Sequence, residues 1–62
     1  MNEKVLDRDA NTLSVNDKVL IVANGMRLEG VINNISPEGV LKVFTTNGTF
    51  KRRSDEVTRL FL

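Results

Sequence analysis

Hydrophobic and polar residues alternate in short runs along most of this chain, and no long run keeps the 3.6-residue period of an amphipathic helix. Such alternation is typical of strands with one buried face. The run over 26–35 contains Gly30 and two asparagines, which a helix would accommodate poorly. The pattern therefore predicts strands over 18–23, 26–35, 40–46, 49–53 and 58–62.

Turn-forming residues separate these runs. Asn24-Gly25 and Asn47-Gly48 are typical of tight hairpin loops, because asparagine and glycine tolerate positive φ. Pro37 suits the first corner of a turn over 36–39. Residues 54–57 are too few for an α-helix and fit a single 3-10 turn, capped by Ser54 or Asp55. These elements predict an all-β fold, a small five-stranded SH3-like barrel with one 3-10 turn before its last strand.

The 62 residues have room for one small domain. A chain of this length buries only about 60% of the surface that its unfolded form exposes, so we expect marginal stability. Residues 1–12 are expected to form a polar N-terminal arm, either docked through Val5 and Leu6 or frayed, and residues 13–62 the barrel. Gly30 inside a strand indicates a bulge, a bend or the close approach of another segment.

The composition argues against catalysis. The chain contains no histidine, cysteine or tyrosine, so the usual general bases, nucleophiles and transition-metal ligands are missing. Its acidic residues suit solvated or capping positions, and its glycines are scattered rather than gathered in a phosphate-binding loop. We therefore expect a protein that is not an enzyme and that uses no metal, no cofactor and no small-molecule substrate.

Hydropathy and cysteine content bear on location. No stretch approaches the roughly 18 consecutive apolar residues of a membrane span, and MNEKVLDRD lacks the apolar core of a signal peptide. Without cysteine the chain has none of the disulfides that secreted domains of this size usually need. We expect a cytoplasmic protein with no membrane partner.

Two motifs carry a resemblance to a known family. Asn16-Asp17-Lys18-Val19-Leu20-Ile21 is similar to the Gly-Asp-x-Val-x-Val opening of KOW domains, with Asn16 in place of the first glycine. Leu28-Glu29-Gly30-Val31-Ile32 carries the glycine characteristic of that family, after a loop one residue shorter than usual. Segments 33–43 and 55–57 continue the resemblance, which covers residues 15–62. KOW domains occur in NusG, its eukaryotic relatives and several ribosomal proteins, so the resemblance implies RNA, the transcription machinery or a ribosomal protein as partner.

Positive charge is concentrated towards the C-terminal end. The net charge is +1; residues 1–39 carry four basic and six acidic side chains, and residues 40–62 carry five basic and two acidic ones. The candidate nucleic-acid-binding residues are Arg27, Lys51, Arg52, Arg53 and Arg59. Such a cluster can bind phosphates in a salt-dependent way. It equally suits a solvated edge strand, where positive charge discourages pairing with another sheet.

Alternation orients the basic strand. If Phe50 points inward, Lys51 and Arg53 share the outward face and Arg52 takes the other. All three phenylalanines are expected in the core, which disfavours recognition of proline-rich peptides, of methyl-lysine or of stacked bases. The first hypothesis is therefore a module that contacts the phosphate backbone of DNA or RNA, accessory to transcription or translation.

A second hypothesis rests on the strand over 18–23, which is apolar on both faces. Either Leu20 and Val22 or Val19 and Ile21 are expected to point outward, and the outward pair needs other residues to cover it. Val5-Leu6 or Leu60-Phe61-Leu62 could supply it. Left uncovered, Leu20 and Val22 would form a patch for docking on another protein or on a second copy of the chain.

Overall fold

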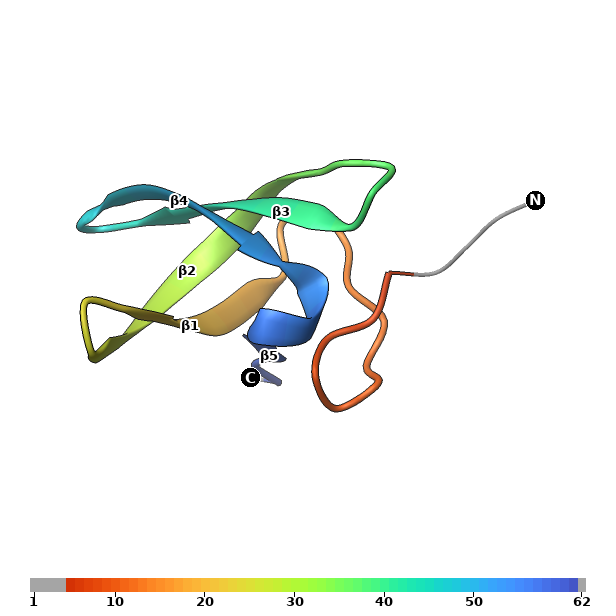
Figure 1. Ribbon diagram of the computed structural model, residues 1–62, viewed down its shortest axis with the longest axis horizontal. Helices are drawn as coiled ribbons and strands as arrows, with labels where there is room; N and C mark the ends of the chain where they lie inside the picture. The colour runs from red at the N-terminus through yellow and green to blue at the C-terminus, as the bar shows by residue number, and fades with distance from the viewer. Residues whose placement is uncertain (1–4, 62) are drawn as a thin grey trace.

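The computed structural model describes residues 5–61, which form a single five-stranded antiparallel sheet (Figure 1). Its elements are, in chain order, β1 (Lys18–Ala23), β2 (Met26–Ile35), β3 (Val40–Thr45), β4 (Gly48–Arg53), the 3-10 turn η1 (Ser54–Glu56) and β5 (Thr58–Arg59). The strands lie in the order β4-β3-β2-β1-β5. The predicted fold class, an all-β five-stranded SH3-like barrel with one 3-10 turn before the last strand, is confirmed. The described residues include no helix suited to crossing a membrane.

The two predicted hairpins are present, and one of them is shifted by a residue. Asn24 and Gly25 have φ of 52° and 76° and join β1 to β2, as predicted. In the β3–β4 hairpin Thr45 pairs with Gly48, so Gly48 already belongs to β4. The Thr45 hydroxyl explains the shift, because it donates to the Gly48 carbonyl at 2.9 Å and accepts from the Asn47 N–H at 3.0 Å.

Asn16 occupies a backbone position that favours glycine. Its φ is +80°, in the left-handed region that asparagine tolerates better than most side chains. The turn is held on both sides: the Asn16 N–H donates to the Ile32 carbonyl at 2.8 Å, and the Asp17 carboxylate accepts from the Ser14 N–H at 2.9 Å. Asn16 therefore adopts the left-handed conformation that the turn before β1 requires.

The core lies between the inward faces of the curved sheet. It contains Leu13, Val19, Ile21, Ile32, Leu41, Val43 and Val57, with Val5, Leu28, Ile35 and Phe50 packed against it. Gly30 faces the same interior. A Cβ there would lie 2.5 Å from Val43 Cγ1 and 2.8 Å from the Phe44 carbonyl oxygen, which confirms a close approach at this glycine. β2 also has a bulge, between Ile32 and Asn34.

Residues 5–12 form a loop that packs on one end of the barrel (Figure 1). Leu6 and Thr12 form an isolated antiparallel bridge. The Arg8 N–H donates to the Val57 carbonyl at 3.1 Å, and Asp7 is buried. This part of the N-terminal arm is docked.

The prediction that all three phenylalanines lie in the core is wrong for two of them. Phe50 is half-buried against the core, but Phe44 is 48% exposed and Phe61 is 66% exposed. Leu41 and Val43 take the inward positions of β3, so alternation turns Phe44 outward. The outer surface of the sheet therefore carries an aromatic ring that the sequence pattern had placed inside.

Candidate nucleic-acid interface

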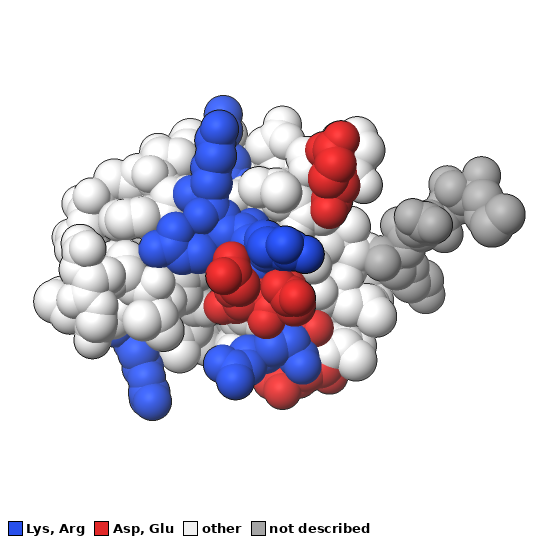
Figure 2. Space-filling model, viewed as in Figure 1, with Lys and Arg blue, Asp and Glu red and all other residues white. Residues whose placement is uncertain are grey.

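The outward face of β3 and β4 carries two lysines that face each other. Lys42 and Lys51 are direct partners in the antiparallel register, and both are exposed. Figure 2 shows basic side chains gathered over this part of the molecule. Like charges directly opposite on a sheet repel each other, and neither lysine forms an ion pair within residues 5–61. The two lysines therefore form a positive surface whose charge repulsion lowers the stability of the fold.

Arg53 extends the positive face towards η1. It is exposed and lies opposite Val40, two positions beyond Lys51 on the same face of β4. Its Nε lies 4.0 Å from the Asp55 carboxylate, with both side chains at least 70% exposed, so the pair is weak. Acidic side chains lie next to the basic group in Figure 2 and bound it on this side.

Arg52 points the other way, as alternation predicts, and closes the barrel. Its Nε and Nη2 donate to the Val22 carbonyl at 3.3 and 3.0 Å, and its Nη1 donates to the Lys51 carbonyl at 2.7 Å. The guanidinium carbon also lies 5.3 Å from the centre of the Phe50 ring. Val22 lies on β1, which is not a pairing partner of β4. The guanidinium of Arg52 is thus engaged in joining β4 to β1.

We expect Arg52→Ala to lower the free energy of unfolding by about 1 kcal/mol, since it removes hydrogen bonds to the Val22 carbonyl that are partly open to solvent. Lys51→Ala is the matched control. It removes the same charge one residue away and relieves the repulsion of Lys42, so its stability should equal or slightly exceed that of the parent. Urea unfolding of the three proteins measures this, and equal losses in both variants would contradict the structural role of Arg52.

Arg59 and Arg27 lie away from this face. Arg59, on β5, donates from Nη1 to the Thr12 carbonyl at 3.2 Å and pairs through Nε with Asp17 at 3.4 Å. Arg27 is exposed near the β1–β2 hairpin, where its partner is Val22. On β2 the residue that pairs with Lys42 is Asn34, and Asn34 lies seven positions from Arg27, or about 23 Å along the strand.

The structure therefore brings together two of the five predicted residues, Lys51 and Arg53, and adds Lys42, which the sequence analysis missed. The position of Lys42 beside Lys51 could have been predicted from the geometry of the β3–β4 hairpin. Once the loop between β3 and β4 is placed, antiparallel pairing puts Lys42 opposite Lys51. Charge clustering along the chain did not reveal it, because Lys42 is nine positions from Lys51.

The two outward residues of β1, Leu20 and Val22, differ in how exposed they are. Val19 and Ile21 are buried, Leu20 is half-buried, and Val22 is 55% exposed. Val5 packs against the core rather than over Val22, and Leu62 lies outside the described residues. Within residues 5–61, Val22 thus has only a partial cover, and the nearby Met26 is also exposed.

Comparison of the chain with protein-family models, with curated proteins and with solved structures gave no match. Within residues 5–61, no group of three or more acidic side chains lies close enough to hold a metal ion.

Proposed function

We propose that this protein is a non-enzymatic module that binds the phosphate backbone of nucleic acid through the outward face of β3 and β4. The observation that carries the proposal is the direct pairing of exposed Lys42 and Lys51, with Arg53 on the same face. Phosphates would neutralise this repelling pair and release counterions. The resemblance to KOW domains supports the same class of partner and an accessory role in transcription or translation.

Charge reversal tests this proposal. We expect the double variant Lys42→Glu plus Lys51→Glu to weaken binding to DNA or RNA at low salt by about tenfold or more. Two lost phosphate contacts should also reduce the slope of log K against log salt by about two. Fluorescence anisotropy with labelled oligonucleotides over a salt series gives both quantities.

Arg8→Glu plus Arg27→Glu is the matched control, because it makes the same change in net charge at two exposed residues, one on the N-terminal loop and one near the β1–β2 hairpin, away from Lys51. It should weaken binding much less than the reversal of Lys42 and Lys51. Equal effects would show attraction by net charge rather than by this face. Absence of binding even at low salt would rule out the proposed function.

The exposure of Val22 and Met26 favours one other candidate, a module that docks on protein or on a second copy of itself. Sedimentation velocity over a concentration series separates the two. Self-association that persists in the lysine double variant and disappears in Val22→Ser would support the second candidate.

A further inference from the structure

Phe44 places an exposed aromatic ring on the same face of β3 as Lys42. Successive residues of a strand point to opposite faces, so residues 42 and 44 project from the same face, about 6.6 Å apart along the strand. Both residues are exposed, and the intervening Val43 is fully buried. A cation and an aromatic ring thus lie side by side on the surface proposed to bind phosphate.

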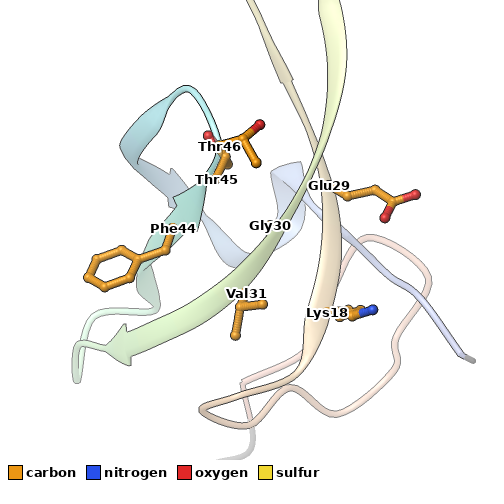
Figure 3. Close-up of a pocket in the computed structure, with 7 residues that line it drawn as sticks. All are labelled: Lys18, Glu29, Gly30, Val31, Phe44, Thr45 and Thr46. Carbon is orange, nitrogen blue, oxygen red and sulfur yellow. The ribbon is translucent and has the colours of Figure 1, made fainter.

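A shallow cavity of about 300 Å³ lies beside this ring. The register across the sheet pairs Phe44 with Val31 and Val31 with Lys18, so an apolar strip ends at a cation. Figure 3 shows Phe44 and Val31 on one side of Gly30, with Lys18 and Glu29 on the other. The cavity is therefore partly apolar, open to solvent and edged by one basic and one acidic side chain.

From this arrangement we infer that the protein binds single-stranded nucleic acid, with one base stacked on Phe44 and the adjoining phosphate at Lys42 and Lys51. The inference rests on the proposed function and gives it a substrate class. Aromatic side chains stack on unpaired bases of any sequence, whereas a duplex keeps its bases stacked inside. Only a single strand can therefore use the ring and the lysines together.

The charges around the cavity agree with this orientation. The Glu29 carboxylate repels phosphate, so the backbone should run on the Lys42 side of Phe44 rather than across the cavity. In Figure 3 the Glu29 and Lys18 side chains lie on the far side of Gly30 from the Phe44 ring, so the stacked base and its phosphate both lie on the side of Phe44 and Lys42.

Tryptophan fluorescence tests the contact directly, because the chain contains no tryptophan. We expect the emission of Phe44→Trp to be quenched by a short single-stranded DNA and to change little with the duplex formed from its complement. Phe61→Trp is the matched control, since Phe61 is also exposed and contacts Arg59 on β5. Equal quenching of both variants, or equal quenching by strand and duplex, would overturn stacking on Phe44.

Affinity measurements separate this inference from the proposed function. Phe44→Ala and Phe44→Leu should each weaken single-strand binding by about 5- to 150-fold, with the duplex affinity and the salt slope unchanged. The leucine variant keeps apolar bulk, so a loss shared by both variants is not due to misfolding. Unchanged single-strand affinity in both variants would overturn the inference and leave the proposed function standing. Failure of the parent protein to bind either nucleic acid at low salt would overturn both.

Discussion

Gly30→Ala should lower the melting temperature by about 10–20 °C. The added Cβ would lie 2.5 Å from Val43 Cγ1, 2.8 Å from the Phe44 carbonyl oxygen and 2.9 Å from Thr45 Cγ2. The carbonyl belongs to β3, which is hydrogen-bonded on both sides, so it cannot move aside without disturbing the sheet. Overpacking of this kind costs about 1–3 kcal/mol, a large part of the roughly 3–9 kcal/mol expected for a chain of this length.

Thermal unfolding followed by circular dichroism measures the effect. Gly25→Ala is the control, because its φ is +76° and no atom lies within 4 Å of the added Cβ. It should cost only the backbone strain of about 1–2 kcal/mol that comes with its positive φ, a strain absent at Gly30, where the cost is steric. Val43→Ala in the Gly30→Ala background removes the nearest atom and should cost less than the same change in the parent. A Gly30→Ala protein that melts within a few degrees of the parent would contradict the close approach.

The features that the sequence predicted are those decided by neighbouring residues. Asn24 and Gly25 adopt positive φ, so β1 and β2 take their predicted bounds. The hairpin after β3 was misplaced by one residue because a side chain intervened: the Thr45 hydroxyl bonds within the loop. Dipeptide preferences contain no information about that contact.

The candidate site depended on partners distant in the chain. Alternation turned Arg52 away from Lys51 and Arg53, but it could not show that the guanidinium reaches the Val22 carbonyl, thirty positions away. Phe44 looked like a core residue until the buried Leu41 and Val43 decided which face of β3 points inward. The contact of Arg52 follows from how the barrel closes, and the exposure of Phe44 follows from which residues of β3 point inward. Local sequence specifies neither.

Asp7 is the other position where we expect a large effect, because it joins the N-terminal loop to β5. It is only 5% exposed. Oδ1 accepts from the backbone N–H groups of Asp9 at 2.9 Å and Asn11 at 2.8 Å. Oδ2 accepts from the backbone N–H of Arg59 at 2.7 Å and from Asn11 Nδ2 at 3.2 Å. The carboxylate is thus the shared acceptor for donors from two parts of the chain that are far apart in sequence.

We expect Asp7→Ala to reduce the free energy of unfolding by about 3 kcal/mol or more, since it leaves partly buried donors without an acceptor. This corresponds to a fall in melting temperature of about 12–24 °C. Asp9→Ala is the matched control: it removes the same charge two residues away from an exposed side chain, and should change stability by less than about 0.5 kcal/mol. Similar losses in the two variants would show a general charge effect rather than the hydrogen bonds of Asp7.

The stabilisation by Asp7 should also depend on pH. Burial raises the pKa of Asp7, but the hydrogen bonds from the Arg59 and Asn11 backbone, the Asn11 side chain and the Asp9 backbone outweigh it and hold the pKa below 3.8. A carboxyl whose pKa is lowered by folding stabilises the fold fully above its unfolded pKa, and this contribution disappears as pH falls through the folded pKa. The stability difference between the parent and Asp7→Asn should therefore be constant above about pH 5 and shrink below about pH 4. Urea unfolding over this range measures it, and a difference that persists unchanged into strong acid would show that the charge of Asp7 is not what these donors require.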